Sequence, residues 1–293
     1  MMSAAEGDEP PSTLYHYTDA YGLLGIVQPS PGSWFIKVER PDLYYQRTVQ
    51  LLASDVRFMN DTEELKFGAR LLRERLIAAA ADVATPPEFQ RVFRDIEGKF
   101  DVDHILEWPS TCYACCFCAE GDLLSQWRGY AGGTGGFALG LSRDALENRT
   151  KVFDRPSVAE LPMPVAPTLK RVVYGEEDGR AAADEAIREI MASEDKSLMT
   201  GRDNNHVRRL GLMLLYSRLL PALATIKAEG FKEEREWRLF LSGERQFRVD
   251  VRARRRGLVP YKQIAVNLSE QLKGLLHDQV TVAVTRPDWP VWS

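Results

Sequence analysis

The segment that begins at Asn60 constrains the fold more than any other part of the chain. Asn60, Asp61 and Thr62 offer side-chain oxygens that cap a helix, and apolar residues then recur at intervals of three or four. This stripe consists of Leu65, Ala69, Leu72 and Leu76. A stripe with this period predicts a long helix over about residues 61–82 with one buried face.

Several other segments have the alternation or the β-branched and aromatic content of strands. They lie near the N-terminus (LYHYT, 14–18), in the middle (TCYACCFCA, 111–119; GFALGL, 136–141) and near the C-terminus (EREWRLFLS, 234–242; QIAVNL, 263–268; VTVAV, 280–284). Helical patterns concentrate between them instead of alternating with them, which favours an α+β fold over a regular βαβ fold. We expect a flexible tail over residues 1–12 and a single domain over 13–293, with helical insertions at about 61–107 and 178–226.

Composition excludes several classes of protein. The 293-residue chain has 38 Lys and Arg against 42 Asp and Glu, and a net charge of -4 gives no overall attraction to nucleic acid or an anionic membrane, so such a partner would need a local basic patch. No apolar run approaches the roughly 20 residues that span a bilayer. The acidic start MMSAAEGDEPPS does not resemble a secretion signal, and four cysteines within residues 112–118 are too close together for a disulfide scaffold. We therefore expect a cytoplasmic protein with no membrane partner.

The densest charged stretch that leads into a strand is EGFKEEREWRLFL at residues 229–241. On a strand, Glu234, Glu236 and Arg238 would point to the same face. Two carboxylates in a partly buried row repel each other, which raises the pKa of one and leaves the other ionised. Such a pair suits chemistry with cationic character, although a solvated edge strand has the same pattern.

Aromatic rings and one histidine give two further candidates. His16 is one of four histidines, and on a strand it would share a face with Leu14 and Thr18. A core histidine bonded to the backbone and a ligand contact both fit this position. Trp127 and Tyr130 are three residues apart and would be neighbours on a helical turn, either as core aromatics or as a stacking platform for a planar ring.

The cysteines form the pattern C-x-x-C-C-x-C, which raises the question of zinc. A strand would place Cys115 on the opposite face from Cys116 and Cys118, and no second Cys or His pair lies at zinc-ribbon or zinc-finger spacing. We therefore expect buried core cysteines and no metal. The glycines at residues 132–136 lead into a strand, whereas a phosphate-binding loop leads into a helix.

The order of these motifs resembles a known family. The chain has LYHYT at 14–18, FMNDTEE at 58–64, CFCAEGDLLSQWRGYA at 116–131 and KAEGFKEEREWR at 227–238. This set resembles the bacterial family designated domain of unknown function 2971, whose pattern includes N-D-x-x-E, D-x-x-x-x-W-x-x-Y and K-x-x-x-F-x-x-E-x-E-W-R. The resemblance covers about residues 14–285.

More distantly, the chain resembles the ADP-ribosyltransferase superfamily of the H-Y-E type. The shared features are a first-strand histidine followed by a helix, a central aromatic residue and a late glutamate on a strand. The resemblance implies a mixed, mostly antiparallel split β core. It also implies an ADP-ribosyltransferase or NAD glycohydrolase that consumes NAD as a substrate. Such an enzyme would be a toxin or a phage-defence effector that acts on nucleic acid or protein.

The resemblance assigns the catalytic roles to Glu236, Glu234 and Tyr130. Glu236 would accept a hydrogen bond from the nicotinamide ribose, and Glu234 would position or deprotonate the acceptor, with Glu233 as a competing carboxylate. Tyr130 would stack on the nicotinamide, with Tyr17 or Trp127 as alternatives for that place. A fixed carboxylate stabilises the oxocarbenium-like ribose that remains when nicotinamide leaves.

The resemblance also implies contacts to the rest of NAD. His16 would bind the adenosine ribose, and the backbone of the strand that carries Tyr17 and Thr18 would hold the nicotinamide amide. Arg128 and Arg238 would clamp the diphosphate or a carboxylate, because a guanidinium binds both groups in a bidentate manner.

Two other hypotheses remain open from the sequence. The same cleft could bind a nucleotide or nucleic acid without chemistry. Alternatively, Asp61, Glu64 and Glu234 could serve a metal-dependent nuclease.

Overall fold

The structure is a computed structural model of the 293-residue chain. It describes residues 11–27, 48–59, 62–100, 102–108, 110–130, 135–148, 150–152, 167–196, 200, 205–244, 250–254, 257–267 and 280–284. Most of the tail expected over residues 1–12 lies outside the described residues.

The elements follow the chain in this order: β1 (Thr13–Thr18), α1 (Ala20–Val27), β2 (Thr48–Asp55), η1 (Val56–Phe58), α3 (Thr62–Ala81), α4 (Pro87–Glu97), α5 (Val102–Glu107), β3 (Ser110–Cys118), α6 (Leu124–Tyr130), β4 (Phe137–Ser142), α7 (Arg143–Asn148), β5 (Thr150–Val152), β6 (Thr168–Arg171), β7 (Val173–Tyr174), α8 (Glu176–Ala192), α10 (Asn205–Leu223), β8 (Ile226–Lys227), η2 (Glu229–Glu234), β9 (Glu236–Glu244), β10 (Asp250–Arg254), β11 (Gly257–Asn267) and β12 (Val280–Val284). The fold is α+β, as expected.

Ten of the described strands form one antiparallel sheet. Its main path runs β10-β11-β2-β3-β1-β4-β12, with β5 beside β11 and with β9 and β6 on the other side of β3. β7 and β8 pair in parallel, as a separate two-stranded ribbon.

The sheet divides at β3. β9 pairs with one edge of β3 from Ser110 to Cys118, so β2 and β1 share the other edge. β2 reaches only Tyr113 and Ala114, and β1 reaches only Cys118. Among the described residues, the two arms therefore leave a stretch of this edge of β3, between Ala114 and Cys118, that pairs with neither β2 nor β1.

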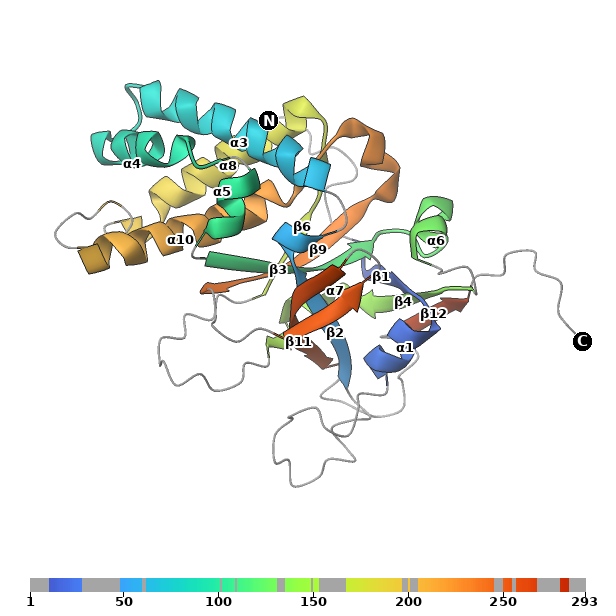
Figure 1. The fold of residues 1–293 in the computed structure, drawn as a ribbon. Coiled ribbons are helices and arrows are strands. Elements are labelled where there is room, and N and C mark those ends of the chain that lie inside the picture. The colour runs from blue at the N-terminus through green and yellow to red at the C-terminus, as the bar shows by residue number, and fades with distance from the viewer. Residues whose placement is uncertain are drawn as a thin grey trace, which may run out of the picture.

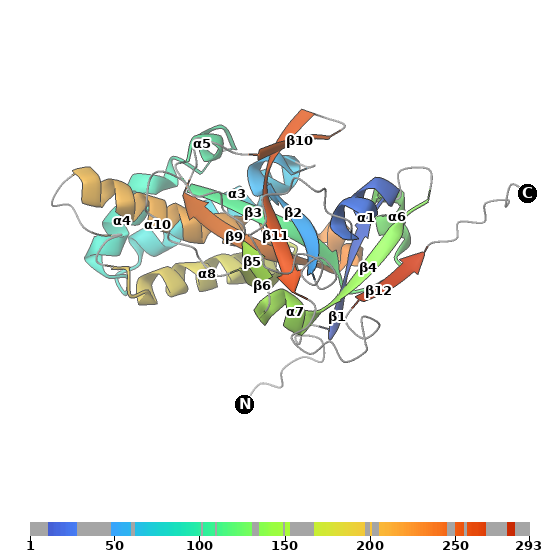
Figure 2. The same ribbon diagram turned by 90° about the horizontal axis from the view of Figure 1, so that it is seen from below.

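Helices cover one face of β3 and β9. Figures 1 and 2 show α3, α4, α5, α8 and α10 gathered as a layer at one end of the molecule, with α1, α6 and α7 beside the rest of the sheet. The side chains of Cys112 and Phe240 join the helical core, whereas those of Cys115, Phe117 and Trp237 join a second core on the opposite face. This alternation is the period of two that a strand imposes, and it defines the two faces on which site residues lie.

The helix expected over residues 61–82 is confirmed as α3. All four apolar residues of its predicted stripe are buried in the helical core, where α3 packs against α4, α8 and α10. The helical segment expected over 178–226 contains α8 and α10, but its last residue, Ile226, already belongs to β8. It pairs there with Val173, which a local pattern does not reveal.

Replacing Gly68 with alanine is expected to destabilise the protein by about 1–3 kcal/mol, because it overpacks a helix contact. A Cβ at this position of α3 would lie 2.4 Å from the carbonyl oxygen of Leu223 in α10, and a backbone atom cannot rotate away. Gly98→Ala is the control, since a Cβ there meets nothing within 4 Å. The measurement is urea unfolding, and equal stability of the two variants would contradict the close approach of α3 and α10.

Candidate functional site

A buried lysine gathers three glutamates from different parts of the chain. The Nζ atom of Lys227, on β8, lies 3.0 Å from Glu64 of α3, 2.7 Å from Glu234 of η2 and 2.8 Å from Glu236 of β9. Together with Arg238 these residues form what we call the Lys227 cluster. It lies on the helical face of β9, between the start of α3 and the end of α10.

Arg238 binds two of the three glutamates of the cluster. Its Nε and Nη2 atoms donate to the two oxygens of Glu236 at 2.7 and 2.9 Å, and Nη2 also donates to Glu64 at 3.2 Å. Its remaining nitrogen, Nη1, donates to the carbonyl oxygen of Ala224. Because Arg238 is buried and engaged on all three nitrogens, the structure does not leave it available to clamp a diphosphate.

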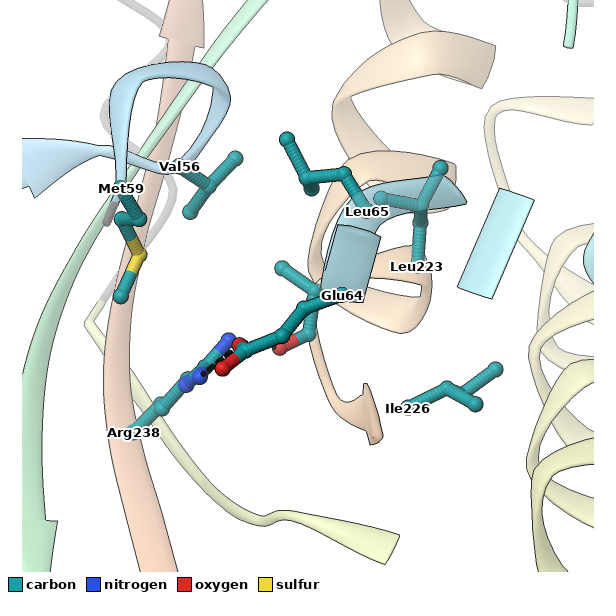
Figure 3. Close-up of a pocket in the computed structure, with 8 residues that line it drawn as sticks. Val56, Met59, Glu64, Leu65, Leu223, Ile226 and Arg238 are labelled. Carbon is teal, nitrogen blue, oxygen red and sulfur yellow. Dashed lines mark hydrogen bonds and ion pairs between the residues drawn. The ribbon is translucent and has the colours of Figure 1, made fainter. Parts of the chain in front are cut away.

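A small pocket opens beside the pair of Glu64 and Arg238. Figure 3 shows these two side chains pointing toward each other across the pocket, with apolar side chains on both sides. The apolar lining consists of Val56, Met59, Leu65, Leu223, Ala224 and Ile226. The pocket has room for about one water molecule, whereas pockets for drug-sized ligands hold about 300–1,000 Å³. It therefore does not accommodate a nucleotide.

The two glutamates of the E-x-E pattern have pKa values displaced in opposite directions. Burial by itself would raise the pKa of Glu236, but the charges of Arg238 and Lys227 outweigh it and lower this pKa to about 2. Burial is also the largest influence on Glu234, and there Lys227 does not offset it, so the pKa of Glu234 is raised. Glu236 thus stays ionised, and Glu234 is the carboxylate that takes up a proton first as the pH falls.

The two carboxylates also differ in how many of their oxygens are bound by neighbouring side chains. Both oxygens of Glu236 are bound by Arg238, and one of them also by Lys227. Glu234 has one oxygen on Lys227, and its side chain is 24% exposed. Within the described residues its other oxygen has no hydrogen-bond partner. Glu234, rather than Glu236, is therefore the carboxylate that a ligand can reach, whereas the neighbouring Glu233 points to solvent outside the cluster.

Glu234 does not lie on the strand that its sequence pattern predicts. We expected Glu234 and Glu236 on one strand, but Glu234 ends the 3₁₀-helix η2 and β9 begins only at Glu236. Between them Arg235 has φ 45°, the only positive φ of a non-glycine residue among those described. This left-handed residue turns the chain so that both carboxylates meet one ammonium group.

Substitutions of Arg235 test this left-handed turn. Arg235→Val is expected to destabilise the protein by about 1–2 kcal/mol, because a β-branched side chain clashes with the backbone at positive φ. Arg235→Gly is the matched control, since glycine adopts this conformation freely. Both variants lose the salt bridge from Arg235 to Glu120, which is exposed and contributes little to stability. Thermal unfolding measures both, and equal losses would contradict the assignment.

Helix α6 brings Tyr130 beside the cluster. Tyr130 is 40% exposed, yet burial of its phenol group, with Cys116 and Glu236 nearby, raises its pKa. Helix α6 contacts η2, so Tyr130 lies near the cluster. Arg128, on the same helix, is exposed and has no hydrogen bond or ion pair among the described residues.

The other two aromatic candidates hold α6 in place. Tyr17 is buried, its hydroxyl donates to the carbonyl oxygen of Glu120 at 2.7 Å, and it accepts from the amide of Leu123 at 3.0 Å. Trp127 packs edge-on against Tyr17 with ring centroids 4.6 Å apart, and its indole N–H donates to Asp122. Burial raises the pKa of Tyr17 to about 12, so it stays a neutral structural residue.

His16 lies on the opposite face of the sheet from Glu236. Its Nδ1 atom is 2.8 Å from the carbonyl oxygen of Cys116, so Nδ1 carries the proton and donates. The ring packs against Phe117 in the second core. His16 therefore satisfies a carbonyl on the stretch of β3 that pairs with neither β2 nor β1. Thr18, two residues further along β1, shares its face.

Residues 126–239 match the family described as a protein of unknown function, DUF2971. No curated protein and no solved structure matches the chain. The stretch that matches DUF2971 contains Tyr130, Lys227, Glu234, Glu236 and Arg238, so most of the Lys227 cluster belongs to the part of the chain that this family defines.

Two members of the cluster were not among the residues we expected at the site. Lys227 begins the K-x-x-x-F-x-x-E-x-E-W-R motif, but its role depends on β8, which no local periodicity predicts. The sequence points to Glu64 only as part of a metal-dependent nuclease, together with Asp61, which lies outside the described residues. The N-D-x-x-E and K-x-x-x-F motifs were the available signal, because they supply charged residues beside apolar core positions.

The cysteines and the remaining charges give no metal site among the residues that the structure describes. Cys115 faces the second core, whereas Cys118 is on the opposite face and donates to the carbonyl oxygen of Glu234. The ammonium group of Lys227 stands among the three glutamates, where a metal ion would otherwise balance their charge. No helix among the described residues is long and apolar enough to cross a membrane.

Proposed function

We propose that the protein cleaves the bond between nicotinamide and ribose in NAD, as an ADP-ribosyltransferase or an NAD glycohydrolase. The observation that carries this proposal is the pair Glu234 and Glu236, held at 2.7 and 2.8 Å from one ammonium group with pKa values displaced in opposite directions. Two carboxylates in unlike environments are the usual apparatus for glycosidic bonds, because one exchanges a proton while the other stays charged.

The residues divide the chemistry between them. Glu234 is the general base: it takes the proton of the attacking hydroxyl, which belongs to water or to a macromolecular acceptor. The carbon–oxygen bond to the ribose forms as the carbon–nitrogen bond to nicotinamide breaks. Glu236 stays ionised and contributes a fixed negative charge near the positive charge that develops on the ribose. Its engagement by Arg238 and Lys227 makes this contribution smaller than that of a free carboxylate.

Helix α6 supplies two contacts that suit NAD. Tyr130, an exposed residue, offers an aromatic ring for a planar base, and the exposed Arg128 offers a guanidinium as a partner for phosphate. Tyr17, His16 and Arg238 have structural partners, so this proposal does not use them as contacts to NAD.

A non-catalytic binding module is the second candidate. The observation that favours it is that the charge of Glu236 is paired with both Lys227 and Arg238. A purely structural charge network requires the same pairing. In that case NAD or a related nucleotide would bind beside α6 and remain intact.

The test is incubation of the purified protein with NAD labelled separately in its nicotinamide and adenine parts. Release of nicotinamide with free ADP-ribose identifies a glycohydrolase, and transfer of adenine label to nucleic acid or protein from a bacterial extract identifies a transferase. NAD that binds but remains intact, with and without extract, supports the binding module. NAD that neither binds nor reacts overturns both candidates.

A further inference from the structure

The parallel ribbon formed by β7 and β8 meets the Lys227 cluster at two points. Within the part of the chain that the structure describes, its strands pair only with each other, and Tyr174 is the register partner of Lys227. Two main-chain hydrogen bonds of 2.9 Å join the ribbon, from Val173 to Thr225 and from Gly175 to Lys227. Isolated two-stranded pairs are marginally stable, and parallel pairs are weaker than antiparallel ones. We therefore attribute the stability of the ribbon to the contacts that its side chains make.

Tyr174 replaces a missing bond of the β6–β9 ladder. The amide of Val172 donates to the carbonyl oxygen of Glu236 at 2.9 Å, and in a regular antiparallel pair the amide of Glu236 would donate back to Val172. It donates instead to the phenol oxygen of Tyr174 at 2.8 Å. Tyr174 thus holds the main chain at the first residue of β9, directly after the left-handed Arg235.

Lys227 holds the side chains of the same segment. Its ammonium group contacts the carboxylates of Glu234 and Glu236, on either side of Arg235. Because Tyr174 and Lys227 are paired in register, one ribbon fixes both the main chain and the carboxylates of this short segment.

We propose that the β7–β8 ribbon is a positioning device for the two glutamates, with Tyr174 and Lys227 as positioning residues. Tyr174 acts through the peptide between Arg235 and Glu236, and Lys227 acts through the two carboxylates. The proposal rests on the proposed catalytic role of Glu234. It assigns to Tyr174 a part in setting the proton affinity of Glu234, through the main chain of Glu236.

The decisive comparison is Tyr174→Phe against Tyr216→Phe. Both remove the hydroxyl of a buried tyrosine, but Tyr216 stacks on Trp108 in the helical core, whereas Tyr174 accepts a hydrogen bond from the amide of Glu236. The readouts are the pKa of the Glu234 carboxyl, from ¹³C NMR of labelled glutamate, and the kinetics of nicotinamide release. Tyr174→Phe is expected to lower this raised pKa toward its ordinary value of about 4.3. It is also expected to lower kcat by roughly 10- to 100-fold with little change in KM, because the base is misplaced.

Lys227→Met separates position from charge. Since the charge of Lys227 lowers the pKa of Glu234, its removal is expected to raise that pKa further, in the opposite direction from Tyr174→Phe. A fall of the pKa in Lys227→Met would overturn the role of the ammonium group.

Equal behaviour of Tyr174→Phe and Tyr216→Phe in both readouts would overturn the positioning role. If Tyr174→Phe does not fold, 4-fluorophenylalanine at position 174 fills the space of the hydroxyl while removing the strong acceptor, and the same shifts are expected. If the wild-type protein releases no nicotinamide, the proposed function fails, but the carboxyl titrations still test the ribbon.

Discussion

Replacing Arg238 with methionine is expected to lower the free energy of unfolding by about 3–5 kcal/mol at neutral pH, because it leaves Glu236 buried without its bidentate partner. The guanidinium supplies two hydrogen bonds to Glu236, one to Glu64 and one to a main-chain carbonyl. Methionine fills much of the same volume, so the loss reports the charge and the hydrogen bonds more than the packing.

The loss in Arg238→Met is expected to depend on pH. In the wild-type protein the pKa of Glu236 is about 2, below its value of about 4.3 in an unfolded chain. The resulting stabilisation is complete above about pH 4.3 and disappears as the pH falls toward 2. Without Arg238 the pKa of Glu236 rises, so protonation removes the buried charge. The difference between variant and wild type should therefore narrow as the pH is lowered from 7 to 4.

Urea unfolding at several pH values measures both effects. Arg188→Met is the matched control, because Arg188 pairs with Glu185 on the surface, where both side chains are more than half exposed. Its loss should stay within about 1 kcal/mol at every pH. A loss in Arg238→Met no larger than in this control would show that the Lys227 cluster is not the buried charge network described above.

Replacing Glu234 with glutamine is expected to lower the rate of nicotinamide release by about 10²–10⁴-fold, the usual contribution of general acid–base catalysis. Glutamine keeps the shape of the side chain but cannot accept the proton. Because Glu234 is partly exposed, folding should be preserved. In the wild-type protein the rate should fall as the pH drops through the raised pKa of Glu234, and this acid limb should be absent from any residual activity of the variant.

Glu233→Gln is the matched control for this experiment. Glu233 precedes Glu234 in η2 and is exposed, so its replacement changes the net charge equally without touching the cluster. We expect it to retain nearly full activity. If both variants retain full activity, Glu234 is not the general base. If both lose activity equally, the loss comes from the change in net charge rather than from the removal of a positioned base.

The sequence predicts the elements whose residue pattern matches the burial of their faces. The stripe on α3 is confirmed because each of its members faces the same helical core. β3 is confirmed because small and aromatic residues suit a strand buried on both faces. β2 was not predicted, since Gln50, Leu51, Ala53 and Ser54 mix polar and apolar residues without the alternation of a half-buried strand.

At the candidate site, the sequence by itself determined which charges are available: the E-x-E pair, Arg238 beside it, and Lys227 and Glu64 in motifs of their own. The tertiary structure alone decided which of them meet. Lys227 and Glu64 join the cluster through β8 and the start of α3, 163 residues apart in numbering from 64 to 227, so no local period reports their contact. The tertiary structure also decided that His16 and Glu236 lie on opposite faces of the sheet, because a shift of one residue in strand register moves a side chain to the other face.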